Sequence, residues 1–160
     1  MSNSTGRRDF LKTVGKMSVL AAAISAGVFN VPDALAQSPW NRTAFDSKDY
    51  SEALKNLGAS GASESDKIKV SAPDIAENGA VVPIDVVSEI PNTISIAVLA
   101  ENNPLPLISA WDYLNGALPI LAVRAKLGKT GDVYAVVKTA DGKYYTAKKE
   151  VKVTVGGCGG

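Results

Sequence analysis

After residue 66 the chain changes to short runs rich in Val, Ile and Ala, with a turn signal about every 8–12 residues. Alternate residues of a strand point to opposite faces, so such runs predict half-buried strands. About seven of them follow one another, at residues 68–71, 80–87, 93–99, 107–113, 118–127, 133–139 and 143–155. This spacing predicts an all-β fold, an immunoglobulin-like antiparallel β-sandwich over residues 67–155.

Residues 37–66 are expected to form an N-terminal helix and a linker. Apolar side chains recur within residues 48–57 at the spacing of one helix face, at Tyr50, Ala53, Leu54 and Leu57. Asp46-Ser47 is a candidate N-cap and Gly58 a candidate stop. We expect residues 37–45 to be a loose lead-in and the small, polar residues 59–65 to be a linker. The apolar face docks on the domain or on a partner, and the sequence leaves both open.

Residues 1–36 resemble an export signal of the twin-arginine type. Arg7-Arg8 precedes Phe-Leu-Lys, a mildly apolar run and the small-residue cleavage sequence Ala-Leu-Ala at residues 34–36. Lys16 and several polar residues interrupt the apolar run, which argues against the alternative of a membrane anchor. We expect the mature chain to begin at Gln37 and to work in the periplasm.

The mature chain is almost neutral. Of the 17 basic and 16 acidic residues, four and two lie in residues 1–36, which leaves 13 and 14 and a net charge of −1. Nucleic-acid binding and electrostatic capture by an anionic membrane both need a basic surplus. We therefore expect neither nucleic acid nor membrane as a partner.

The chain has no histidine and one cysteine, Cys158. The first fact excludes Ser-His-Asp triads, His-ligated metals and c-type haem attachment, so we expect no cofactor and no metal site. The second excludes an intramolecular disulfide. Because a free thiol is vulnerable in an oxidising compartment, an unpaired cysteine in an exported protein calls for a function.

The C-terminal segment places Cys158 between two glycine pairs, Gly156-Gly157 and Gly159-Gly160. Glycine has no side chain and the most backbone freedom, so residues 156–160 are expected to form an arm that enters a deep pocket on another protein. No residue of this segment can act as a base, and a free thiol titrates near 8.5 or so. Catalytic groups also need rigid placement. We interpret Cys158 as the attachment point of a carried substrate and expect no catalytic residue.

The C-terminal segment has several other interpretations. Ubiquitin-like carriers use a terminal Gly-Gly carboxylate, but they work in the cytosol without an export signal. A thiol enzyme is disfavoured because no histidine is available as a base. A structural module joined by an intermolecular Cys158 disulfide stays open, since a carrier thiol also forms such a dimer on oxidation. An accidental cysteine fits poorly with its position between two glycine pairs.

The C-terminal sequence resembles that of the SoxY family, the sulfur-carrier subunits of periplasmic thiosulfate oxidation. The resemblance rests on Gly-Gly-Cys-Gly-Gly after the Val-Lys-Val-Thr-Val run. Upstream, it extends over the turn at residues 141–143, the strand at residues 133–136 and Glu-Asn-Asn-Pro-Leu-Pro-Leu at residues 101–107. It covers roughly residues 45–160. The terminal motif is highly specific, whereas the strand matches alone are weak.

The resemblance implies an immunoglobulin-like fold and a heterodimer with SoxZ, a β-sandwich subunit that has no signal of its own. It implies that the cytochrome SoxXA attaches thiosulfate oxidatively as a cysteine S-thiosulfonate, that SoxB releases sulfate, and that SoxCD, where present, oxidises the remaining sulfane sulfur. On this chain the attachment atom is the sulfur of Cys158. The carrier arm is formed by Gly156, Gly157, Gly159 and Gly160.

Two further groups of residues have more than one interpretation. Trp111 and Tyr113 belong either to a partner interface or to ordinary sandwich packing. The loop at residues 103–108 either contacts a partner or is a surface turn. Lys148 and Lys149 are expected to form a solvated strand face.

Overall fold

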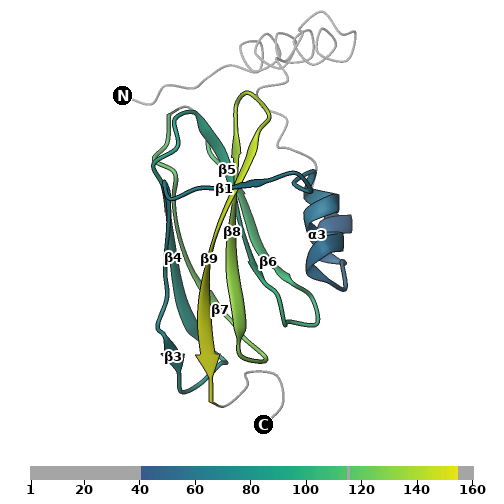
Figure 1. The fold of residues 1–160 in the computed structure, drawn as a ribbon, viewed down its shortest axis with the longest axis vertical. Coiled ribbons are helices and arrows are strands. Elements are labelled where there is room, and N and C mark those ends of the chain that lie inside the picture. The colour runs from purple at the N-terminus through teal and green to yellow at the C-terminus, as the bar shows by residue number, and fades with distance from the viewer. Residues whose placement is uncertain (1–40, 115, 155–160) are drawn as a thin grey trace, which may run out of the picture. The chain divides into compact units, whose positions relative to one another are not determined.

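The computed structural model describes residues 41–114 and 116–154, which form two short helices and nine strands (Figure 1). The helices come first, α2 at Arg42–Phe45 and α3 at Tyr50–Leu57. The strands are β1 (Ser63–Glu64), β2 (Ile68–Ser71), β3 (Ile75–Ala76), β4 (Val82–Ser88), β5 (Thr93–Ala100), β6 (Leu107–Asp112), β7 (Ile120–Ala125), β8 (Gly131–Thr139) and β9 (Tyr144–Val153). In these ranges no helix is long and apolar enough to cross a membrane. The expected signal, residues 1–36, lies outside the described residues.

The strands form two sheets. The larger has the order β1-β9-β8-β5-β6, with β3 also paired to β9, and the smaller has the order β2-β4-β7. The long neighbours β5 and β8, β8 and β9, and β4 and β7 all run antiparallel. Apolar residues of both sheets meet in one core. The predicted all-β sandwich is therefore confirmed.

Alternating apolar residues of the strands build the core. Every second residue of β4 is buried, because successive side chains of a strand point to opposite faces. Ile84 and Val86 of β4 lie in one cluster with Ile96 and Val98 of β5, and all four side chains are fully buried. Burial of a side chain of this size contributes about 1.5–3 kcal/mol to stability.

Helices α2 and α3 pack against the larger sheet on the side away from this core (Figure 1). Ala53 of α3 is buried in a second apolar cluster with Leu99 of β5, Leu107 of β6 and Val136 of β8. Strand β5 is thus covered on both faces, which explains its continuous run of buried residues from Ile96 onward. In the described part of the chain, the helix face docks on its own domain.

Helix α3 begins later than predicted because a different residue caps it. The side chain of Asp49 accepts a hydrogen bond of 2.8 Å from the backbone N–H of Glu52, which satisfies a donor of the first turn. Ser47, part of the predicted cap, is buried instead, and its hydroxyl accepts a hydrogen bond of 2.9 Å from the side chain of Asn56. The predicted end at Gly58 is confirmed, in the left-handed conformation with φ of 79°.

Three short elements differ from the sequence prediction. The predicted strands correspond to β2 and β4–β9, with small differences at their ends. Strands β1, inside the predicted linker, and β3 were missed, and helix α2 lies in the predicted lead-in. Both missed strands have two residues and pair in parallel with β9. A two-residue strand shows no period of its own, so only its partner defines it.

The contact between α3 and the sheet predicts a pH dependence. The rings of Tyr50 and Tyr134 lie 4.3 Å apart, and burial, followed by the charges of Tyr134 and Glu101, raises the pKa of Tyr50 to about 12. An unfolded tyrosine ionises near about 10. The folded protein therefore holds a proton that the unfolded chain releases. This contribution to stability is fully present below pH 10 and falls as the pH rises towards 12.

Absorbance titration of tyrosinate should accordingly show a late-ionising group that Tyr50→Phe removes and Tyr145→Phe retains. Denaturant titrations at rising pH should show stability falling less steeply in Tyr50→Phe than in the wild type. If the late ionisation were lost in Tyr145→Phe and kept in Tyr50→Phe, its assignment to Tyr50 would be wrong.

Candidate functional site

The predicted site at Cys158 and the glycines beside it lie outside the described residues. The structure describes the segment from which they continue, the end of strand β9. We call Lys152, Val153 and Thr154 the arm root. At most about 14 Å of extended chain separates Thr154 from Cys158, at roughly 3.3–3.6 Å per residue. The position of the root therefore decides which part of the molecule the thiol can reach.

On its outer edge, the arm root is bound by β3 and the residues beside it. The backbone N–H of Lys152 donates to the carbonyl of Asp74 at 2.9 Å, and that of Thr154 donates to the carbonyl of Ala76 at 3.1 Å. The hydroxyl of Thr154 also donates to the carbonyl of Glu77 at 3.0 Å. Sheet-like bonding thus continues one residue beyond β9.

On its inner edge, the arm root is bound by Thr130. The pairing of β8 with β9 ends at Gly131 and Val151. Beyond it, the backbone N–H of Val153 donates to Thr130 Oγ1 at 2.9 Å, and this hydroxyl lies 3.4 Å from the carbonyl oxygen of Val153. The side chain of Thr130 therefore replaces a backbone partner of β9 beyond the point where its pairing with β8 ends. The root is held from both edges.

Two asparagines of the β5–β6 loop hold the loop that carries Thr130. Asn102 Nδ2 donates to the carbonyl of Thr130 at 2.8 Å. Asn103 Nδ2 donates to the carbonyl of Lys126 at 2.8 Å, and its Oδ1 accepts from the N–H of Gly128 at 2.9 Å. The loop at residues 103–108, left open between a partner contact and a surface turn, thus begins with a bracing residue.

Close packing at this brace leaves room for a side chain at residue 131 only if Asn102 moves away from its bond to Thr130. A Cβ at Gly131 would lie 2.4 Å from Asn102 Nδ2, closer than such atoms approach. The sequence indicated residues 101–107 through the resemblance and residues 103–108 as a partner contact or a surface turn, but it gave no role to Thr130. The available signal was the pair Asn102-Asn103 before a proline, since asparagine side chains commonly bond loop backbone.

Exposed lysines occur in the root itself and in the segment between β7 and β8. Lys126, Lys129 and Lys152 are exposed, and none of them forms an ion pair among the described residues. Lys148 and Lys149, expected on a solvated face, have 50% and 33% of their side-chain area exposed, and both also pair with acids of other elements. Lys148 Nζ lies 2.7 Å from a carboxylate oxygen of Asp132, and Lys149 Nζ lies 3.0 Å from one of Asp74.

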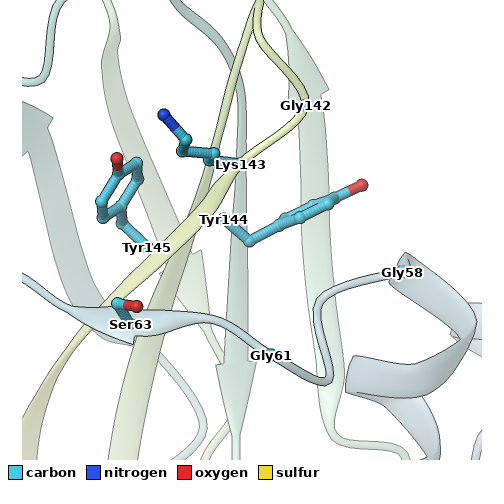
Figure 2. Close-up of a pocket in the computed structure, with 7 residues that line it drawn as sticks. All are labelled: Gly58, Gly61, Ser63, Gly142, Lys143, Tyr144 and Tyr145. Carbon is cyan, nitrogen blue, oxygen red and sulfur yellow. The ribbon is translucent and has the colours of Figure 1, made fainter.

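A cavity of about 230 Å³ lies at the opposite end of β9 (Figure 2). It is lined by Gly58, Gly61, Ser63, Gly142, Lys143, Tyr144 and Tyr145. In Figure 2 the side chains of Lys143 and Tyr145 point to one side of the strand and that of Tyr144 to the other, so they do not converge on a ligand. Lys143 pairs with Asp141 at 2.7 Å and lowers the pKa of that carboxyl group to about 2.

This cavity lies beyond the reach of the arm. Ten residues of β9 separate the two ends, about 30 Å at the rise of a strand. The chain between Thr154 and Cys158 spans at most about 14 Å. Among the described residues there is also no cluster of acidic, Cys or His side chains suited to a metal ion. Among the described residues, the groups around the arm root therefore serve to hold its backbone in place.

Trp111 and Tyr113 have different environments. Tyr113 packs against the core, and its hydroxyl donates to the carbonyl of Ile120 at 2.9 Å. Burial raises the pKa of this hydroxyl. Trp111 is 57% exposed. The packing interpretation therefore suits Tyr113 and does not suit Trp111.

Comparison with known proteins finds one family. The family model described as "Sulfur oxidation protein SoxY" matches residues 54–158, a range that includes Cys158. The solved structure of the sulfur carrier protein SoxY from Chlorobium limicola f thiosulfatophilum is 35% identical, with a TM-score of 0.61 over 71% of this chain and 99% of that one. A superoxide reductase (neelaredoxin) from Ignicoccus hospitalis is 23% identical over 54% of this chain and 80% of that one, with a TM-score of 0.49. No curated protein sequence matches.

The bonds of Thr130 predict a local effect on the arm root. Thr130→Val keeps the side-chain shape and removes both contacts to Val153, whereas Thr130→Ser keeps the hydroxyl. One hydrogen bond contributes about 1 kcal/mol, so the amide of Val153 should exchange its hydrogen about five-fold faster in the valine variant. Native-state hydrogen exchange measures this. Equal protection in both variants would show that Thr130 does not hold the root.

Proposed function

Because this chain belongs to the SoxY family of sulfur oxidation proteins, it is a sulfur carrier and not an enzyme, and we propose that it carries thiosulfate-derived sulfur on Cys158. The observation that carries the proposal is the match of the family through residue 158, which is the only cysteine of the sequence. A thiol is the side chain that forms a covalent bond to sulfur and releases it again by exchange or hydrolysis.

The proposed loading step is an oxidation. The thiolate of Cys158 and one thiosulfate dianion join in a sulfur–sulfur bond and lose two electrons, which leaves a cysteine S-thiosulfonate with one negative charge. The resemblance implies that SoxXA accepts these electrons. This chain has no histidine and no second cysteine, so its own residues provide neither a redox couple nor an imidazole base.

The proposed unloading step is a hydrolysis. Water attacks the terminal sulfone sulfur, sulfate and two protons leave, and a persulfide with one negative charge stays on Cys158. The resemblance implies that SoxB performs this step and that SoxCD, where present, oxidises the persulfide sulfur. Further rounds therefore need only that each enzyme reaches the same thiol.

The described structure supports separate roles for two parts of the chain. The arm root fixes the origin of the arm, and the glycine-rich arm presents the thiol. Hydrogen bonds on both edges hold the root, so the thiol stays within about 14 Å of a fixed point. A short tether of this kind gives an effective concentration of millimolar order at a docked enzyme. Gly156, Gly157, Gly159 and Gly160 add no side chains that would obstruct a narrow pocket. An unperturbed thiol is only a few per cent ionised at neutral pH, so each enzyme must activate it.

The remaining proposals concern partners and location. They comprise a heterodimer with SoxZ, transient docking of SoxXA, SoxB and SoxCD, and export of residues 37–160 to the periplasm by the twin-arginine route. Residues 37–66 provide the helix and linker, residues 67–155 the sandwich and residues 156–160 the arm. The covalent sulfur intermediates are cargo, so the proposed carrier needs no cofactor.

Intact-mass measurement of the protein from cells grown on thiosulfate tests the carrier function. The wild type should show mass additions matching a thiosulfonate or sulfane sulfur that reductant removes. Cys158→Ser should show none. A matched control moves the thiol to an exposed site on α3, in the double variant Cys158→Ser with Ser51→Cys, and should not be loaded. Finding only free thiol and disulfide-linked dimer in the wild type, or equal loading of the control, would refute the proposal.

A further inference from the structure

Two exposed threonines hold the arm root through their hydroxyl groups. Thr130 Oγ1 accepts a hydrogen bond of 2.9 Å from the N–H of Val153, on the inner edge of the root. Thr154 Oγ1 donates one of 3.0 Å to the carbonyl of Glu77, on the outer edge. We call Thr130 and Thr154 the hydroxyl clamp. Because both side chains are exposed, the clamp contributes nothing to the filling of the core.

Asn102 supports the clamp from a third segment of the chain. Its Nδ2 donates to the carbonyl of Thr130 at 2.8 Å, across 28 positions of sequence. A Cβ at Gly131, the residue after Thr130, would collide with the same Nδ2. The contact is therefore close-packed on an exposed loop, where no core requires it. Three separate segments thus meet at the last two residues of the root.

Release of the clamp would move the origin of the arm. Strand β9 ends beside β3 (Figure 1), and its backbone pairing with β8 ends earlier, at Val151. Two backbone bonds to the carbonyls of Asp74 and Ala76 also hold the root, so loss of the clamp raises the population of a frayed root. Seven residue steps separate Val151 from Cys158. They span about 25 Å when extended, against about 14 Å from Thr154.

The length of the tether decides which active sites the thiol can enter. With the root closed, an enzyme must bring its reacting group within about 14 Å of Thr154. A frayed root reaches deeper pockets, and it also lets the thiol fold back onto its own domain. Effective concentration falls as about the −3/2 power of tether length, so the change from four steps to seven lowers it about two-fold at a docked enzyme.

We propose that Thr130 and Thr154 are positioning residues of the carrier, with Asn102 acting through Thr130, and that they restrict Cys158 to active sites no deeper than about 14 Å. The inference rests on the proposed function, because reach matters only if Cys158 delivers cargo to an enzyme. The competing explanation is that these bonds serve only the stability of the domain. The two differ in the reach of the thiol, which can be measured without any enzyme.

A second cysteine on the domain measures this reach. Glu64→Cys places a thiol on β1, opposite Thr146 of β9. At the rise of a strand, Thr146 lies about 26 Å from Thr154 and about 17 Å from Val151. A disulfide needs Cα atoms about 6 Å apart, so the site is out of range of the closed root and within range of the frayed one.

Paired variants change the clamp with little change in shape. Thr130→Val with Thr154→Val removes both hydroxyls, whereas Thr130→Ser with Thr154→Ser keeps them. One hydrogen bond changes the frayed population about five-fold, so a disulfide between residues 64 and 158 should form about 20-fold faster in the valine pair than in the wild type. The serine pair should match the wild type. Peptide mapping after mild oxidation of dilute protein measures these rates.

Two controls accompany this measurement. Glu77→Cys lies beside the root, so its disulfide with Cys158 should form at rates within about two-fold in the wild type and both pairs. Asn102→Ala should speed the bridge to residue 64 up to about five-fold and add little to Thr130→Val, because it acts through the same contact. All substituted clamp sites are exposed, so melting temperatures should stay close to that of the wild type.

Hydrolysis of the thiosulfonate form by SoxB gives the functional readout. The KM of the valine pair should rise about two-fold with kcat unchanged, since the tether affects delivery and not the chemical step. Equal bridging to residue 64 in the valine and serine pairs, or an unchanged KM, would overturn the positioning role. Either result leaves the carrier function standing if Cys158 is loaded in cells. Absence of loading would refute the carrier function, whereas the measured reach would stay valid.

Discussion

The arm root depends on the position of β9 within the larger sheet. Strand β9 pairs with β8 along most of its length, and its other edge receives β1 at one end and β3 at the other. A last strand left at an open edge would fray towards the chain terminus. Because both edges of β9 are bonded, the backbone is held as far as Thr154. The proposed arm therefore begins at a defined point.

This arrangement separates stability from chemistry. Buried residues of β4, β5, β8 and β9 stabilise the sandwich, and none of the fully buried side chains in the described part of the chain is ionisable. The brace through Asn102, Asn103 and Thr130 transfers that rigidity to the loops around the root. None of these bonds requires a reactive side chain. In the proposed function the protein contributes a fixed origin and a short reach, and the redox and hydrolytic groups come from partner enzymes.

The two faces and two ends of the sandwich have different surroundings. Helices α2 and α3 cover the larger sheet, so its outer face is already packed. Trp111 and Ile120 are exposed on β6 and β7, the strands that end the two sheets, and the arm root lies at the C-terminal end of β9.

The sequence alone determined the strand content, the helix face and the single candidate thiol. Each of these is a local property: Val151 and Val153 alternate with polar residues, Tyr50 and Leu54 share a helix face, and Cys158 is unique. Only the tertiary structure decided which residues hold the root and which apolar residues stay exposed. Strands β1 and β3 exist because β9 pairs with them, and Thr130 bonds Val153 across 23 positions of sequence. The physical reason is the distance along the chain over which each feature is determined. Periodicity shows which residues of one helix or strand share a face. Whether a strand edge is paired, which side chain bonds a loop and whether Trp111 is exposed depend on other segments that pack beside them.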